Sequence, residues 1–161
     1  IGAYAFYGCN ELEEVVAQEI EYVDSYAFCN SSIKKFSAKG NYYIWDSAFR
    51  NCKNLETVYV PSTITNFNSN TFANKQRNDI LFFVTSTDNT YLASVKDKFA
   101  GADIITLDAY LADTATYAKG RHIISGYNIC DAFYDGIHEL DLEKSNAISN
   151  SDFNCGYIFS R

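Results

Sequence analysis

Apolar positions recur along this chain in a fixed order and at a nearly constant interval. The clearest marker is an Ala-Phe pair. Phe6, Phe28 and Phe49 are separated by 22 and then 21 residues, and Phe72, preceded by Thr71, follows after 23. The residue five positions before each phenylalanine is also apolar: Ile1, Val23, Ile44 and Phe67. A period of this size predicts a solenoid of stacked repeats rather than one irregular core.

The same marker returns near the end of the chain, where Ala132-Phe133 and Asp152-Phe153 lie 20 residues apart. One unit of this size cannot bury its own apolar side, whereas neighbours stacked above and below can bury it. Six phenylalanines are therefore predicted to form an internal column: Phe6, Phe28, Phe49, Phe72, Phe133 and Phe153. Because burying one Phe side chain stabilises a fold by roughly 1.5–3 kcal/mol, we expect this column to dominate stability.

After each phenylalanine the pattern changes to an alternation of apolar and polar residues. The segment Leu55–Val60 alternates in this way, and the segments 14–17, 35–38 and 139–142 share its phase. Alternation with period two predicts a half-buried strand. Each unit is thus predicted to contain a helical or 3₁₀ turn around Ala-Phe, a second turn, and a short strand. The strands should align into a parallel sheet along one face.

The residues between the inward apolar positions of each strand are predicted to face outward, where a ligand could bind. They are Glu14, Val16, Lys35, Ser37, Thr57, Tyr59, Phe83, Glu139 and Asp141. Stacking would place Val16, Tyr59 and Phe83 in one apolar and aromatic stripe, and contiguous exposed apolar surface often marks an interface. The alternative is that these are isolated exposed apolar residues, which are common and carry no function.

Two of the units share a longer pattern. Ile1–Leu12 reads Ile-Gly-x-x-Ala-Phe-x-x-Cys-x-x-Leu, and Ile44–Leu55 repeats it with Trp in place of Gly, followed by Val58, Val60 and Pro61. This pattern resembles the BspA-like (Treponema-type) leucine-rich repeat. Several spaced positions recur together, which makes the resemblance specific.

The resemblance is clear over residues 1–84 and returns in degraded form over 128–161. It implies an α/β repeat solenoid: a right-handed leucine-rich-repeat superhelix with a parallel sheet on one face and short helical or 3₁₀ turns opposite. It also implies a secreted or surface-anchored protein of microbes, often those living with a host. The family's role is adhesion and protein binding rather than catalysis.

The segment 85–127 interrupts the repeats. After an apolar strand at 80–84, the pattern predicts a helix that Asp88 caps and that runs to Phe99, then a strand at 102–105 and a second helix at 108–119. A cap of this kind would cover the last open unit. We favour one continuous solenoid with a bulky irregular coil, and two short arrays packed end to end remain the alternative.

Composition narrows the classes of partner. The 161 residues carry a formal charge of −7 with a sequence pI near 4.7, which argues against nucleic acid because such binders present a basic patch. No apolar run approaches the roughly 20 residues that a membrane span needs, so no membrane insertion is predicted. The chain starts inside a repeat and contains no Met. We expect a fragment or a mature product, so the absence of a signal peptide is uninformative.

Five cysteines leave at least one thiol unpaired. Cys9 and Cys52 occupy equivalent places two units apart, about 10 Å for stacked strands, whereas a disulfide requires Cα atoms within roughly 4.4–6.8 Å. Buried free thiols are therefore favoured, with a disulfide or a metal site as weaker alternatives. Cys29 could pair only if the short second unit shifted its register. The same interpretation applies to Cys130 and Cys155.

The sequence contains no motif that carries chemistry. The residues Cys130, Asp131, Asp135 and His138 could be imagined as a nucleophile set, but their spacing matches no known motif. The acidic residues between positions 108 and 143 lack the spacing of a calcium loop. His122 is expected at a strand edge. No catalytic, cofactor or metal site is predicted.

The sequence therefore predicts a non-enzymatic binding module that is extracellular or on a cell surface and that engages an extracellular or host protein. One alternative is a structural spacer within a larger repeat protein. Another is an accessory carbohydrate-binding role in which exposed Tyr and Asn side chains hold sugar. Asn30-Ser31-Ser32 is a glycosylation sequon, which has meaning only in a eukaryotic secretory host.

Overall fold

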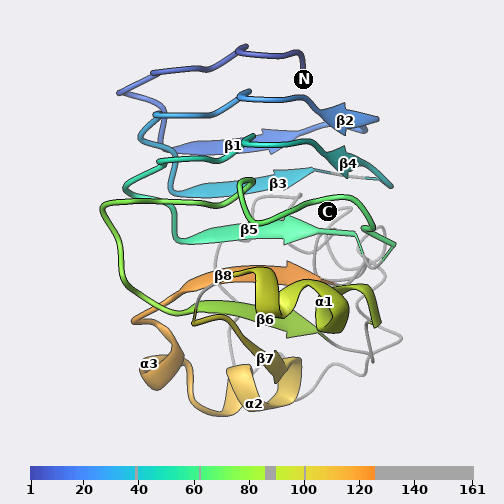
Figure 1. Ribbon diagram of the computed structural model, residues 1–161, viewed down its shortest axis with the longest axis vertical. Coiled ribbons are helices and arrows are strands. Elements are labelled where there is room, and N and C mark those ends of the chain that lie inside the picture. Colours follow the sequence, from blue (N-terminus) through green and yellow to red (C-terminus); the bar gives the residue numbers. More distant parts are fainter. Residues whose placement is uncertain (39, 62, 86–89, 100, 126–161) are drawn as a thin grey trace, which may run out of the picture.

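The computed structural model describes residues 1–38, 40–61, 63–85, 90–99 and 101–125 of the chain. Its main element is a six-stranded parallel sheet, and a two-stranded parallel sheet lies at one corner of the stacked repeats (Figure 1). The large sheet contains β1 (Glu14–Ala17), β3 (Lys35–Ala38), β5 (Thr57–Val60), β6 (Leu81–Thr85), β7 (Asp103–Thr106) and β8 (Arg121–Ser125). The small sheet contains β2 (Tyr22–Val23) and β4 (Tyr43–Ile44).

Successive repeats stack as coils, and we number each coil by its phenylalanine. The first coil carries Phe6, the second Phe28, the third Phe49 and the fourth Phe72. The amide of Phe6 donates to the carbonyl of Ala27 at 2.7 Å, and the amides of Phe28 and Phe49 donate in the same way to the third and fourth coils at 2.8 and 2.9 Å. The Ala-Phe side of the molecule therefore has its own ladder of hydrogen bonds between coils.

The Ala-Phe segments form consecutive β-turns in place of the predicted helical or 3₁₀ turns. In the first coil, the amide of Ala5 donates to the carbonyl of Gly2 and that of Cys9 to Phe6, each at 3.2 Å. Tyr4 and Gly8 occupy the third positions of these turns with φ of 59° and 68°. A left-handed residue at every fourth position reverses the chain twice, so a helix cannot propagate.

Four of the six phenylalanines of the predicted column stack in the described chain. The ring centroids of Phe6 and Phe28 are 5.2 Å apart, those of Phe28 and Phe49 5.1 Å, and those of Phe49 and Phe72 5.7 Å, with interplanar angles of 6°, 7° and 11°. Phe28, Phe49 and Phe72 are at most 1% exposed. The column positions Phe133 and Phe153 lie outside the described residues.

The strand order departs from the chain order after the third coil. The large sheet runs β1-β3-β5-β8-β6-β7, so β8 lies between the strands of the third and fourth coils. All five residues of β8 and of β6 are buried. Consecutive strands of the large sheet pair with each other from β1 to β3 to β5 and again from β6 to β7, whereas β8 separates β5 from β6. A strand that is apolar on both faces is stable only in the interior of a sheet.

The helices lie between β6 and β8 in the chain. They are α1 (Thr90–Val95), the 3₁₀ helix η1 (Lys96–Lys98), α2 (Leu107–Ala112) and α3 (Thr114–Tyr117). The helix predicted at 108–119 is broken at Asp113, whose φ of −146° is not helical and whose side chain accepts from the amide of Thr116 at 3.2 Å. Asp113 therefore caps α3 instead of continuing α2.

Candidate binding surfaces

The outer face of the large sheet carries the predicted ligand-facing residues in rows that cross the strands. One row, set by the strand register, consists of Glu14, Lys35, Thr57, His122, Phe82 and Asp103. Glu14 and Asp103 at its ends are exposed and Lys35 is half-buried. Thr57, His122 and Phe82 in the middle are only 7%, 5% and 8% exposed. The row is therefore accessible at its ends and buried at its centre.

The apolar and aromatic stripe predicted on this face is not a continuous exposed surface. Val16 is 39% exposed, but Ser37 and Tyr59 are 3% and 5% exposed. Phe83 is fully buried in the core, where its ring packs against Phe67 and Phe99. The prediction that Phe83 faces outward is wrong. Because β6 is apolar on both faces, its sequence shows no alternation of apolar and polar residues that would indicate which side chains face outward.

Two further predicted ligand-facing residues, Glu139 and Asp141, lie outside the described residues.

His122 lies in the interior of the sheet rather than at a strand edge, which corrects the sequence prediction. Its ring stacks on Phe82 with centroids 5.8 Å apart, and Tyr110 and Tyr117 close the site from α2 and α3. The His122 Nε2 atom lies 2.6 Å from the carbonyl of Tyr117. Burial lowers the pKa of His122 below its ordinary value of 6.5, so the ring is neutral at pH 7.

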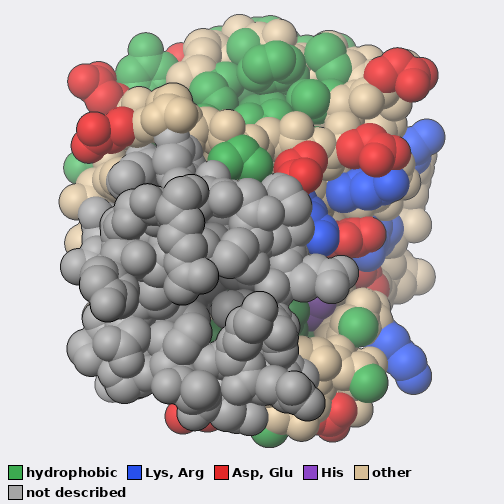
Figure 2. Space-filling view, turned by 180° about the vertical axis from the view of Figure 1, so that it is seen from behind, with side chains coloured by type: hydrophobic (Ala, Val, Ile, Leu, Met, Phe, Trp, Pro, Cys, Tyr) green, Lys and Arg blue, Asp and Glu red, His purple; other side chains and the backbone are tan. Residues whose placement is uncertain are grey.

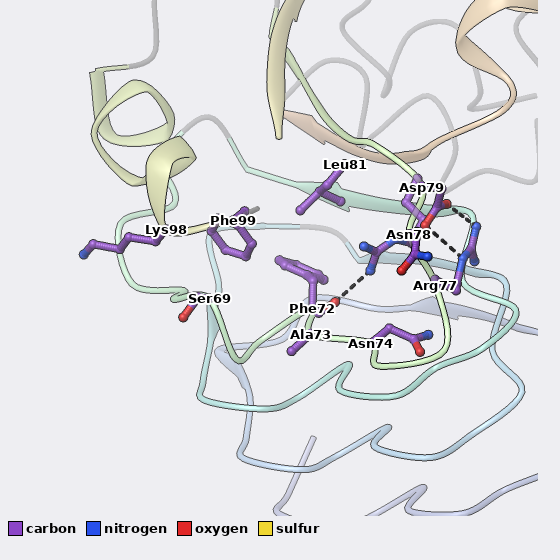
Figure 3. A pocket seen from close by; sticks show the side chains of 11 residues that line it. Ser69, Phe72, Ala73, Asn74, Arg77, Asn78, Asp79, Leu81, Lys98 and Phe99 are labelled. Carbon is purple, nitrogen blue, oxygen red and sulfur yellow. Dashed lines mark hydrogen bonds and ion pairs between the residues drawn. The ribbon is translucent and has the colours of Figure 1, made fainter. Parts of the chain in front are cut away.

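A pocket of about 450 Å³ opens where the fourth coil meets η1 and β8. Figure 3 shows Phe72, Phe99 and Leu81 on its apolar side, with Asp79 and Arg77 on the other. Asp79 forms ion pairs with Arg77 and with the Nε of Arg121, the latter at 3.2 Å.

The charged side of this pocket is used by the fold itself. The Arg121 Nη1 donates to the carbonyl of Phe72 at 2.7 Å, and the Arg77 Nη1 donates to the carbonyls of Lys53 and Leu55. These bonds tie the start of β8 to the third and fourth coils. We interpret the cluster as the anchor of β8, since both arginines direct their described hydrogen bonds to backbone carbonyls and to Asp79.

Three exposed aromatic residues lie in or directly after the strands of the small sheet. Tyr22, Tyr43 and Trp45 are 42%, 53% and 50% exposed. Tyr22 and Tyr43 are register partners in the parallel pair β2–β4, while their neighbours Val23 and Ile44 are fully buried. We call Tyr22, Tyr43 and Trp45 the aromatic corner. Sequence analysis missed it because two-residue strands are too short to show alternation.

The end of the molecule formed by the first coil is also apolar. Phe6 and Val15 are only partly buried there, although their counterparts Phe28 and Phe36 in the second coil are fully buried. Figure 2 shows hydrophobic side chains gathered over this end, with acidic side chains on either side of them. Accessible apolar surface is therefore concentrated on the first three coils.

The cysteines of the described chain are free thiols: Cys9, Cys29 and Cys52. Cys52 Sγ donates to the carbonyl of Phe28 at 3.0 Å and lies 3.7 Å from Ser31 Oγ. Burial raises the pKa of Cys52 to about 12, so its thiolate does not form at neutral pH. The described part of the chain contains no group of three or more His, Cys, Asp or Glu side chains that could hold a metal ion.

The repeat pattern matches a known family, the BspA type leucine-rich repeat region, in six copies over residues 1–94. The chain belongs to the BspA-type leucine-rich repeat family. No curated protein and no solved structure matches it. Leucine-rich repeat domains of this kind are generally non-enzymatic and usually bind proteins. The predicted degraded repeats at 128–161 lie beyond the match and outside the described residues.

None of the helices in the described ranges has the length and apolar character needed to cross a bilayer.

Proposed function

We propose that this BspA-type leucine-rich repeat protein is a non-enzymatic adhesion module that binds an extracellular protein of a host or of a neighbouring cell. In this proposal the coils continue as a right-handed superhelical solenoid on a secreted or surface-anchored protein. The family supports protein binding in general. The location of the protein and the kind of partner are the proposed part.

The aromatic corner is the observation that carries the proposal. Tyr and Trp dominate binding hot spots because they bury a large rigid area at low entropic cost. Tyr43 and Trp45 are half-exposed. Tyr43 precedes and Trp45 follows Ile44, a fully buried residue that fixes the backbone between them. A pre-organised aromatic surface loses little conformational freedom when a partner covers it.

The accessible part of the sheet face is the second proposed contact region. Glu14, Val16 and Lys35 lie on the first two strands and remain exposed or half-buried. They lie on β1 and β3, the strands of the first two coils, and β2 and β4, which carry two residues of the aromatic corner, follow those strands in the chain. A partner that covers the first three coils could reach both regions.

The test is binding of the purified protein to a panel of extracellular-matrix and serum proteins by surface plasmon resonance. The variant Tyr43→Ser/Trp45→Ser should lose saturable binding while keeping the wild-type melting temperature, because both side chains are half-exposed. Thr63→Ala is the control, at an exposed position whose hydroxyl donates to Asn41 Oδ1, two residues before Tyr43. Absence of binding across the panel would favour the structural spacer, and binding unaffected by the double variant would move the site elsewhere.

A further inference from the structure

A second candidate site lies on the opposite corner of the coils. It is a groove of about 280 Å³ lined by four amides and two lysines: Asn10, Asn30, Asn51, Gln76, Lys53 and Lys75. No Asp or Glu is among its described lining residues. This composition is unusual for a chain whose formal charge is −7.

The repeat itself builds the groove. Asn30 and Asn51 both lie two positions after a column phenylalanine, where the φ of 59° and 56° requires a residue that tolerates left-handed backbone. Asn10, Lys53 and Gln76 lie four positions after theirs. Because stacked strands are about 4.8 Å apart, equivalent positions form rows along the stack, and the groove crosses four coils. An extended ligand with a repeating unit would match such rows.

Asn51, one of the amides that line the groove, has an oxygen atom without a hydrogen-bond partner in the described part of the chain. The Asn51 Oδ1 atom is buried and makes no hydrogen bond with the described residues. Buried carbonyl oxygens almost always accept a hydrogen bond, so this atom calls for a donor from a ligand or from water. The Asn30 Nδ2, by contrast, donates to the hydroxyl of Tyr7 at 2.8 Å.

That hydrogen bond holds an aromatic ring beside the amides. Tyr7 is 48% exposed, and its ring lies 5.6 Å from that of Tyr4, which in turn stacks on Tyr26. Amide side chains both donate to and accept from hydroxyl groups. An exposed aromatic face beside them can pack on the apolar face of a sugar ring. The lysines add charge that would pair with a carboxylate.

We propose that this groove binds an acidic saccharide, with its hydroxyl groups on the amide rows and its carboxylate at Lys53 and Lys75. This site is separate from the aromatic corner, and it gives the protein a second ligand class beside the protein partner proposed above.

Isothermal titration of the protein with oligogalacturonate, and with the same oligomer methyl-esterified to remove its charge, tests this proposal. We expect saturable binding of the acidic form and roughly tenfold weaker binding of the ester, since an exposed charged contact is a modest one. Asn51→Gly removes the amide and keeps the left-handed backbone, so it should weaken both forms without unfolding the protein. Lys53→Gln/Lys75→Gln should weaken only the acidic form.

Lys34→Gln, which removes a lysine outside the groove, is the control and should leave binding unchanged. The proposal fails if neither oligomer binds, if the ester and the acid bind equally, or if Asn51→Gly has no effect. Binding of oligoglutamate as tight as or tighter than that of oligogalacturonate would also overturn it, because the groove would then recognise carboxylates without recognising the sugar. Binding to the protein panel is measured separately, with the aromatic-corner variant Tyr43→Ser/Trp45→Ser. That result does not depend on whether the groove binds a saccharide.

Discussion

The first three coils and the segment from β6 to β8 build one sheet by different rules. In the coils, strands that follow one another in the repeat pattern pair with each other, as β1 does with β3 and β3 with β5. Beyond β5, the last described strand of the chain, β8, pairs with β5 and β6 on either side. Chain order and spatial order agree in the first region and separate in the second.

The difference teaches what a repeat specifies. Each coil contributes a phenylalanine to the column and a turn whose amides bond to the next coil, so a coil fits only on an equivalent neighbour. The strands β6 and β8 carry apolar residues on both faces and therefore fit beside any strand with a matching inner row. Their order is decided by side contacts such as the Asp79–Arg121 ion pair, which no period encodes.

The largest expected effect is on the column. Phe49→Ala should lower the free energy of unfolding by ~3–5 kcal/mol, because the ring stacks on two neighbours and is 1% exposed. Thr65→Ala, at an exposed position of the same stack, should change it very little. Chemical denaturation measures both. Similar midpoints for the two variants would contradict the stacked-column description of the coils.

The next effect probes the entry of β8. Gly120→Ala should destabilise the protein by roughly 1–3 kcal/mol through overpacking. A Cβ at this position would lie 2.5 Å from a ring carbon of Phe82 and 2.7 Å from the carbonyl oxygen of Ile80. Gly2→Ala is the matched control, since nothing lies within 4 Å of its Cβ. Equal stability of the two variants would mean that β8 does not enter the sheet beside β6.

The third effect depends on pH and belongs to the same region. Burial keeps the folded-state pKa of His122 below its ordinary value of 6.5, so the unfolded chain binds a proton more readily than the folded one. Stability should therefore fall as the pH falls below about 6.5 and stay level above it. Urea denaturation at several pH values measures this dependence. His122→Gln should flatten the curve, and an unchanged curve would contradict the buried neutral ring.

The smallest effect concerns reactivity rather than stability. Cys52, with a pKa of about 12, should resist maleimide labelling in the native protein at pH 8, whereas the half-buried Cys9 should react first. Peptide mapping by mass spectrometry distinguishes the two sites. Rapid native labelling of Cys52 would show that the third coil opens readily. Labelling in denaturant provides the fully reactive reference.

Sequence patterning was most successful where several positions repeat together. The period placed Phe28 and Phe49 in the column and Val58 on the inner face because each unit repeats the same environment. It failed for Phe83 and His122, because β6 and β8 show no alternation of apolar and polar residues from which the outward face could be predicted. It also missed the aromatic corner, because the positions equivalent to Trp45 in the other coils are Gly2, Asp24 and Asn68.

By itself, the sequence determined the family, the repeat, the four described phenylalanines of the column and the parallel strands, since these depend on local spacing that the coils share. Only the tertiary structure decided that β8 lies between β5 and β6, that Tyr59 and Phe83 are buried, and that Asn30 and Asn51 line one groove. The reason is physical. Burial and neighbour choice depend on which surfaces meet in space, and strands that are apolar on both faces leave that choice open until the whole sheet packs.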